Sequence, residues 1–406
     1  MEEKKLVPKL RFPGFTEPWE QRKLGEIVSA YSGGTPSASN KEYYGGDIPF
    51  IRSAEINNNH TELYITQKGL KDSSAKLVEK GTILYAMYGA TSGEVSISQI
   101  DGAINQAILA MVPLMYDGEF IAQYLRRQKK NIINKYLQGG QGNLSANIVL
   151  NLQIQLPGVD EANQITSFFV KLDNLITLHQ RKLEHLKLKK KSLLQKLFPK
   201  EGEVYPELRF PGFTAPWEQR KLGEIVERVT RKNNGQSDRP LTISAQDGLV
   251  DQCEYFDRQV ASRDMSNYYL IKKGEFAYNK SYSDGYPFGA IKRLDYYDKG
   301  ALSTLYIIFK IVDDRIGSDF MVAYYMTSLW YKEISKRAAE GARNHGLLNI
   351  STEDFFNSEL KIPNDIKEQI KVGKFVNQFD QYITLHQRKL EHLQLLKKAL
   401  LQQLFV

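Results

Sequence analysis

Few residues in this chain have the types and spacing that catalysis requires. Of the six histidines, His60 and His345 stand alone, and no cysteine or carboxylate cluster accompanies any of the six at metal-ligand spacing. The one cysteine, Cys253, has no base that the sequence assigns to it. The glycines of 139–143 lack the Lys-Ser or Lys-Thr pair of a phosphate-binding loop. The sequence therefore predicts no catalytic residue and no metal site, and it favours a surface loop for these glycines.

Two segments of the chain occur twice, which indicates an internal duplication. Residues 10–28 and 208–226 differ at a single position. Residues 173–198 and 380–405 differ at six of 26 positions. Since repeats decide the architecture of a fold, we interpret the chain as two diverged copies of one unit.

Between the repeated segments, both halves have the same order of expected elements. Apolar runs predict strands, and a period of 3.6 residues predicts a helix before each glycine-rich loop. The expected elements are strands at 81–86 and 274–278, strands at 107–112 and 305–312, helices at 120–137 and 320–339, and strands at 154–157 and 360–363. The predicted fold class is α/β, with two globular domains of the same kind.

The segment after each of these domains has the heptad pattern of a coiled coil. Asp160 and Asp365 suit the start of a helix, because a carboxylate accepts from the free amides there. One seam consists of Ile165, Phe169, Leu172, Ile176, Leu183, Leu186, Leu193 and Leu197. The other consists of Val372, Val376, Phe379, Ile383, Leu390, Leu393, Leu400 and Leu404.

Each predicted helix of about 38 residues would be about 57 Å long at 1.5 Å per residue. Its apolar stripe needs a partner, and the connectivity favours an antiparallel pair of helices. The sequence predicts four parts: a domain at 1–158, a helical spacer at 159–200, a second domain at 201–364 and a second spacer at 365–406. Nearly identical helices suit one partner bound twice, whereas different domains suit two different targets.

These residues also carry a family resemblance. LRFPGFTEPWEQRKLGEI from Leu10, the segment Gly46 to Arg52, and the helix endings at 192–198 and 399–405 resemble the specificity subunits of type I restriction-modification systems. The resemblance covers essentially the whole chain, although the second half lacks a clear copy of the Gly46 to Arg52 segment. It implies two target-recognition domains that bind double-stranded DNA at an asymmetric bipartite site.

The resemblance also implies partners and cofactors. The helices would dock two methyltransferase subunits, and restriction subunits would join through them. S-adenosylmethionine, ATP and Mg would be used by these partners and not by this chain. The Asn/Asp-Pro-Pro-aromatic motif of methyltransferases that act on exocyclic amines is absent.

Base reading needs side chains with paired donors and acceptors, such as Arg for guanine and Asn or Gln for adenine. The candidates are polar residues on loops that we expect at one end of each domain. In the first domain they are Arg52, Ser53, Tyr88, Thr91, Ser92, Gln106, Gln141 and Asn143. In the second they are Ser244, Gln246, Lys280, Tyr282, Ser283, Tyr286, Arg343, Asn344 and His345. For each residue the alternative is a solvent-exposed loop side chain.

The sequence leaves two or more interpretations open for the seam histidines, for a run of lysines and for the overall function. His179 and His386 interrupt the two seams, either as a pH-sensitive polar layer or, as we favour, as hydrogen-bonded histidines at a domain–helix junction. The lysines of 187–191 suit phosphate binding or, as we favour, a solvated helix face. A non-catalytic adaptor that binds proteins through two α/β heads is the main alternative function, and a nuclease or methyltransferase is the second.

The net charge of +8 is carried by the predicted helices. Residues 159–200 carry +5 and 365–406 carry +3, whereas 1–158 carry +2 and 201–364 carry −2. Nearly neutral recognition domains predict modest DNA affinity without partner subunits, because phosphate neutralisation dominates non-specific binding. The single cysteine and the lack of a membrane-length apolar run favour the cytoplasm and no membrane contact.

Overall fold

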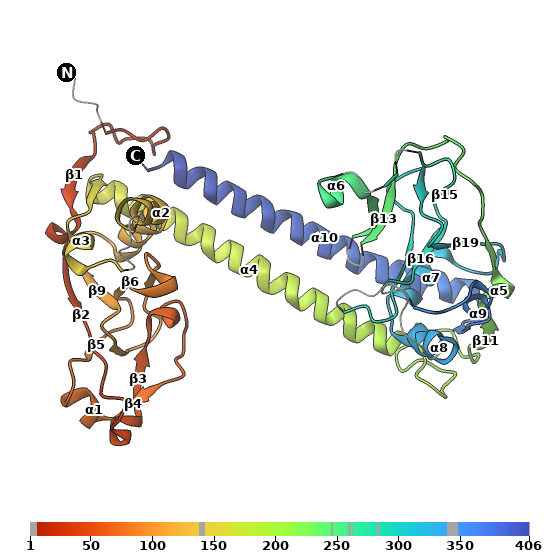
Figure 1. Cartoon of the computed structure of the whole chain (residues 1–406), viewed down its shortest axis with the longest axis horizontal. Coiled ribbons are helices and arrows are strands. Elements are labelled where there is room, and N and C mark those ends of the chain that lie inside the picture. The colour runs from red at the N-terminus through yellow and green to blue at the C-terminus, as the bar shows by residue number, and fades with distance from the viewer. Residues whose placement is uncertain are drawn as a thin grey trace. The chain divides into compact units, whose positions relative to one another are not determined.

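The computed structural model describes residues 6–137, 143–244, 247–258, 261–262, 264–281, 285–338 and 348–405. The chain divides into two compact units (Figure 1). Unit 1 contains Met1–His179 and Lys389–Val406, and unit 2 contains Gln180–Arg388. Each unit has an α/β head and parts of the two long helices, α4 (Val159–Leu197) and α10 (Ile366–Gln403). This division cuts both helices, so the four-part boundaries expected from the sequence stay a prediction.

The head of unit 1 is built on an antiparallel sheet with the strand order β2-β9-β6-β7. Its strands are β2 (Val28–Ser32), β9 (Ile108–Pro113), β6 (Ile83–Ala86) and β7 (Val95–Ile97). All four residues of β6 are buried, as a central strand covered on both faces requires. Helix α2 (Gly118–Tyr136) packs on β6 and β7, and the Asp117 side chain caps its first turn.

Smaller elements complete this head. A second sheet has the order β4-β3-β8-β5, in which β3 and β8 run parallel. Its strands are β4 (Tyr64–Ile65), β3 (Tyr44–Ile51), β8 (Gly102–Ile104) and β5 (Lys76–Val78). The others are the pair β1 (Glu20–Lys23) and β10 (Gln153–Leu156), helices α1 (Gln67–Lys71) and α3 (Ala146–Leu150), and 3-10 turns η1 (Leu24–Glu26), η2 (Lys41–Tyr43), η3 (Ser53–Glu55) and η4 (Gly89–Thr91).

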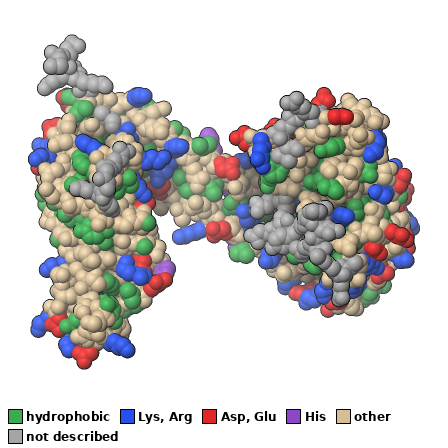
Figure 2. All heavy atoms as spheres, in the orientation of Figure 1, with side chains coloured by type: hydrophobic (Ala, Val, Ile, Leu, Met, Phe, Trp, Pro, Cys, Tyr) green, Lys and Arg blue, Asp and Glu red, His purple; other side chains and the backbone are tan. Residues whose placement is uncertain are grey.

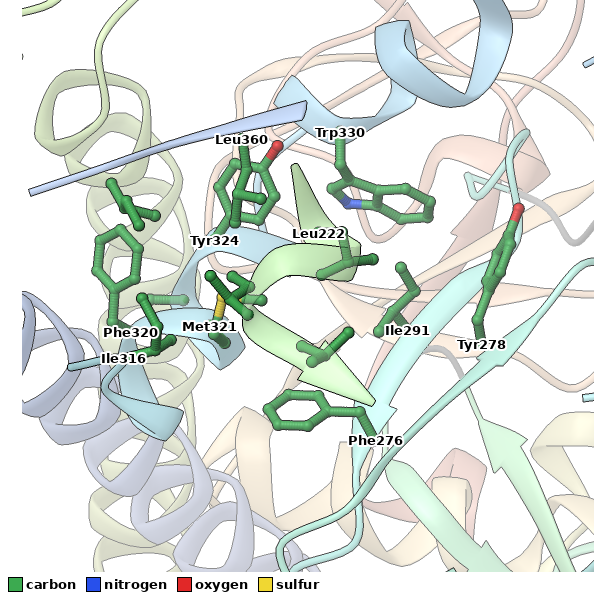
Figure 3. Close-up of a cluster of buried hydrophobic side chains, with 14 of the residues drawn as sticks. Leu222, Phe276, Tyr278, Ile291, Ile316, Phe320, Met321, Tyr324, Trp330 and Leu360 are labelled. Carbon is green, nitrogen blue, oxygen red and sulfur yellow. The ribbon is translucent and has the colours of Figure 1, made fainter. Parts of the chain in front are cut away.

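The head of unit 2 repeats the main sheet with the order β12-β19-β16-β17. Its strands are β12 (Val226–Arg228), β19 (Ile307–Ile311), β16 (Phe276–Asn279) and β17 (Ala290–Arg293). Helices α7 (Ser318–Tyr325) and α8 (Leu329–Arg337) cover it. Figure 3 shows Phe320 and Met321 of α7, Trp330 of α8, Phe276 of β16 and Ile291 of β17 converging in one buried cluster.

The remaining elements of unit 2 also have counterparts in unit 1. They are the pairs β15 (Tyr269–Lys272) with β18 (Lys299–Leu302), β13 (Leu241–Ser244) with β14 (Gly248–Asp251), and β11 (Glu218–Lys221) with β20 (Glu359–Ile362), and helices α5 (Leu222–Ile225), α6 (Gln252–Phe256) and α9 (Thr352–Phe356). A parallel bridge joins Pro240 to Ala301, as Phe50 pairs in parallel with Ala103 in unit 1. Strand β13 therefore occupies the position of β3, although no copy of the Gly46 to Arg52 sequence exists there.

The two-domain α/β prediction with long helices is confirmed, and two details of it are wrong. The single helix expected at 320–339 is broken between α7 and α8. At this break the Trp330 indole donates to the Tyr325 carbonyl, and the Thr327 hydroxyl accepts from the Leu329 amide. Asp365 caps α10 through the Lys367 amide, but Asp160 lies inside the first turn of α4, which begins at Val159.

The two long helices run antiparallel within each unit. In unit 1, Asp173 of α4 pairs with Lys397 of α10. Phe169, which is nearer the start of α4, contacts Phe405, which follows the end of α10. The order of the contacts is therefore opposite along the two helices. In unit 2, Lys190 pairs with Asp380, and Leu194 lies in the same buried cluster as Val376. All sixteen seam residues expected from the heptads are buried or half-buried. The two lysines that interrupt the seams thus reach carboxylates on the opposite helix.

Each long helix ends by inserting a phenylalanine into a head. Phe405 at the end of α10 contacts Trp19 and Phe120 in unit 1. Phe198 at the end of α4 contacts Trp217 and Phe320 in unit 2. The repeated segment thus supplies the tryptophan that receives the helix end.

A second repeated contact lies at the helix starts. Arg11 pairs with Glu161 and Arg209 with Glu368, both at 2.7 Å, and both carboxylates lie in the first turn of a long helix. A carboxylate there also interacts favourably with the helix dipole. Among the described residues, no helix combines the length and the apolar content needed to cross a bilayer.

Candidate nucleic-acid interface

Sequence-distant loops of unit 1 meet at the carboxyl end of β6. Ile51 at the end of β3 pairs with Ile104, and Ala86 at the end of β6 pairs with Ile108. The Met87 amide donates to the Ala107 carbonyl at 2.8 Å. The loops that follow β3, β6 and β8 therefore leave their sheets at one edge of the head.

Four of the expected base-reading residues have side chains available at this edge. Tyr88 forms an isolated bridge with Asn143, which joins the loop after β6 to the segment before α3. Tyr88 and Thr91 are half-buried, whereas Gln106 and Asn143 are exposed. The Gln106 amide oxygen accepts from the Thr35 hydroxyl at 2.6 Å. This side chain is therefore held in place at the surface.

Ser92 lies at the same edge but is buried. Its hydroxyl is within hydrogen-bonding distance of the Met87 and Gly89 carbonyls, and its side chain is 4% exposed. Ser92 is therefore engaged within the loop after β6, and its role in base reading stays a prediction. Ser53, by contrast, is half-buried in η3.

Arg52 reaches this edge with two carboxylate partners. Its guanidinium donates to Glu55 at 2.9 Å and to Glu62 at 2.8 Å. The Arg52 hydrogen bonds lower the pKa of the buried Glu55 carboxyl from 4.5 to about 2, although burial opposes this shift. Arg52 would have to leave these partners to contact a guanine.

The corresponding edge of unit 2 has different side chains. Tyr278 pairs with Ile307, and the Leu348 amide donates to the Lys280 carbonyl, as the Leu144 amide donates to Met87 in unit 1. The Lys280 ammonium lies 3.4 Å from the Ile350 carbonyl. Ser244 is buried and donates to Asp247, so its side chain is engaged within its own turn. Tyr286 is half-buried beside this edge.

Seven of the candidates lie outside the described residues. They are Gln141, Gln246, Tyr282, Ser283, Arg343, Asn344 and His345. Their role in base reading stays a prediction, as it does for the candidates that the structure describes.

The structure adds one candidate at the unit 2 edge that the sequence did not nominate. Tyr306 lies between β18 and β19, where unit 1 has the Gln106 loop, and its hydroxyl is 3.3 Å from that of Thr242. Leu305 beside it is 60% exposed. In the sequence, only the position of Tyr306 directly before the strand β19 could have indicated it as a candidate.

No metal-binding chemistry is apparent in the described part of the chain. No group of three or more His, Cys, Asp or Glu side chains within it could hold a metal ion. His179 is buried and His386 half-buried, and both make interactions with other residues. Both histidines therefore have interaction partners within the structure.

Comparisons with known proteins agree with this architecture. Residues 16–188 match the family described as Type I restriction modification DNA specificity domain. The chain is 28% identical to the type I restriction enzyme MjaIX specificity subunit of Methanocaldococcus jannaschii, over 53% of each chain, so this match spans about half of that relative. It is 22% identical to the MjaVIII specificity subunit of the same organism, over 97% of this chain and 92% of the other.

A solved structure shows the same fold. The S subunit of a type I restriction-modification system from M. genitalium superposes with a TM-score of 0.63 at 16% identity, covering 98% of this chain and 99% of that one. The matched family and relatives carry the names of a DNA specificity domain and of specificity subunits, in agreement with the non-catalytic recognition subunit that the sequence resemblance implies. Through residues 16–188 and these relatives, the chain is similar to type I restriction-modification specificity subunits.

Proposed function

We propose that this chain recognises an asymmetric, bipartite DNA site with one head for each half-site. The observation that carries the proposal is the pair of heads with one topology and different side chains at the corresponding edge. Tyr88 and Asn143 stand at this edge in unit 1, whereas Lys280 and Tyr306 stand there in unit 2. Different side chains on one scaffold suit different base sequences.

We further propose that the long helices dock two methyltransferase subunits, through which restriction subunits join. Three exposed apolar helix positions of unit 1 recur as exposed apolar positions of unit 2 at an offset of 207. Unit 1 exposes Leu175, Leu178 and Leu395, and unit 2 exposes Tyr382, Leu385 and Leu188. In each unit these residues flank an ion pair, Asp173–Lys397 or Asp380–Lys190. Exposed apolar patches mark interaction surfaces, and a repeated patch suits one partner bound twice.

The docking proposal is tested by removing one patch at a time. Leu178→Ser with Leu395→Ser should reduce the bound methyltransferase copies from two to one, and so should Leu385→Ser with Leu188→Ser. All four changes together should abolish assembly, as measured by native mass spectrometry. The control is Leu114→Ser with Met115→Ser, which removes equally exposed residues from the head of unit 1. Two copies bound to the fourfold variant would disprove this docking surface.

In this proposal the chain itself needs no cofactor. S-adenosylmethionine, ATP and Mg serve the partner subunits, and the complex works on cytoplasmic DNA. A mobility shift of genomic DNA fragments, with and without a methyltransferase partner, tests DNA recognition. A complex that binds only proteins and retards no fragment would favour an adaptor instead.

A further inference from the structure

Unit 2 contains a cavity of about 960 Å³ between the last turns of α4, the first half of α10 and the head. This volume is at the upper end of the range for ligand sites. Its floor includes Ile291 and Trp330, which belong to the buried cluster (Figure 3). Edge strand β17 and helix α7 form further walls. The cavity is therefore bounded by a rigid core on one side and a charged helix on the other.

The lining of the cavity has more cations than carboxylates. Six Lys or Arg side chains line it, against four Asp side chains. Two of the cations are neutralised locally, because Arg293 pairs with Asp295 and Asp319 and Lys190 pairs with Asp380. The remaining carboxylate, Asp247, accepts from Ser244.

Three lysines of the lining have no carboxylate partner among the described residues. Lys187 and Lys191 extend from exposed positions on α4, and Lys292 is half-buried on β17. Burial lowers the pKa of Lys292, and nearby Lys190 lowers it further, while Asp380 and Asp247 oppose the shift. A cation held in such surroundings is stabilised by an added anion.

The position of the cavity indicates which anion it receives. Asp247 and Gly248, in the turn after β13, line it, and so do Gly285 and Tyr286 on the β16–β17 connection. Both segments belong to the edge that we propose reads bases in unit 2. The cavity therefore borders the candidate nucleic-acid interface, so a DNA strand bound at that edge would pass beside it.

We propose that this cavity binds backbone phosphates of the target DNA, with Lys187, Lys191 and Lys292 as the contacts. This inference rests on the proposed function and extends the DNA-binding surface of unit 2 from the loops to helix α4. It also gives the positive charge of segment 159–200 a role in DNA binding, because lysines of this segment would add to the cations of the nearly neutral head. Phosphate contacts of this kind position a reader without specifying sequence.

The test is the salt dependence of DNA binding by the full chain in complex with its methyltransferase subunits. The probe is a duplex that carries the target site, identified by sequencing the modified bases. Each lost phosphate contact reduces the slope of log affinity against log salt by about 0.9. Lys187→Gln, Lys191→Gln and Lys292→Gln together should therefore reduce the slope by about 2 to 3, with the preferred sequence unchanged.

The control is the triple variant Lys182→Gln, Lys189→Gln and Lys374→Gln. These lysines are exposed on the same helices of unit 2 and do not line the cavity. The control should leave the slope close to that of the unmodified chain. An equal slope in both triple variants, with normal binding, would overturn the inference and leave the proposed function intact. If the unmodified complex binds no duplex, the proposed function itself fails.

Phosphate ethylation interference locates the contact independently. Ethylation beside the half-site of unit 2 should weaken binding of the unmodified complex and have little effect on the cavity variant. Interference that is identical in both complexes would contradict the inference. Thermal unfolding of both triple variants, expected near that of the unmodified chain, separates lost contacts from lost structure.

Discussion

At the scale of single residues, the candidate interface contains exposed side chains as well as buried and ion-paired ones. Gln106 and Asn143 are exposed, Ser92 is buried, and Arg52 is paired with Glu55 and Glu62. The sequence could nominate all of these as polar loop residues. It could not distinguish them, because the engagement of Ser92 and Arg52 depends on three-dimensional turn geometry.

Replacing Glu55 tests the role of the buried carboxylate in unit 1. Its folded pKa of about 2 lies below its ordinary value of 4.5, so its stabilisation is present above about pH 4.5 and is lost as the pH falls towards 2. Glu55→Gln should therefore cost about 1–3 kcal/mol at pH 7 and progressively less below pH 4.5. Urea unfolding across this pH range measures the difference. A cost that is independent of pH would show that the charge of Glu55 does not stabilise the head.

Replacing Lys292 should separate stability from DNA binding. An apolar side chain removes a half-buried cation without a carboxylate partner, so Lys292→Met should stabilise unit 2 by about 1 kcal/mol while weakening DNA binding. Differential scanning calorimetry and a salt titration of binding measure the two effects. Reduced stability together with unchanged binding would mean that Lys292 is a structural residue.

At the scale of elements, the long helices were the most predictable part of the chain. Their heptads span many turns, and α4 and α10 begin within a residue of the positions expected. The break between α7 and α8 was not predictable, because the apolar period continues across it. The insertion of Phe405 into the head of unit 1 was not predictable either, because the contact joins opposite ends of the chain.

The helix ends should each stabilise one head. Phe405→Ala removes a fully buried ring from unit 1, and Phe198→Ala removes its counterpart from unit 2. Each change should cost about 3–5 kcal/mol. Hydrogen exchange monitored by mass spectrometry should show increased exchange in the head that receives the altered ring, and Phe→Leu at each position should have a smaller effect. Equal loosening of both heads by either variant would contradict this assignment.

At the scale of the whole molecule, the duplication could be predicted from the sequence. Which loops meet at the candidate interface of each unit could not be predicted. The strand order β2-β9-β6-β7 brings the loop after β6 beside residues that follow β8, and the same order recurs in unit 2. Sequence similarity did not reveal β13 as the counterpart of β3, because pairing geometry is retained where side chains have diverged. On the face drawn in Figure 2, basic and acidic side chains are interspersed over both heads. Net charge therefore does not by itself indicate a DNA-binding face.

The central claim is that each head reads its own half of a bipartite DNA site. The most direct test replaces residues 228–358, which lie in unit 2, with those of a related specificity subunit and maps the modified bases of the host genome by single-molecule sequencing. We expect that one half-site changes while the other half-site and the gap between them stay the same. A change in both half-sites, or in neither, would contradict it.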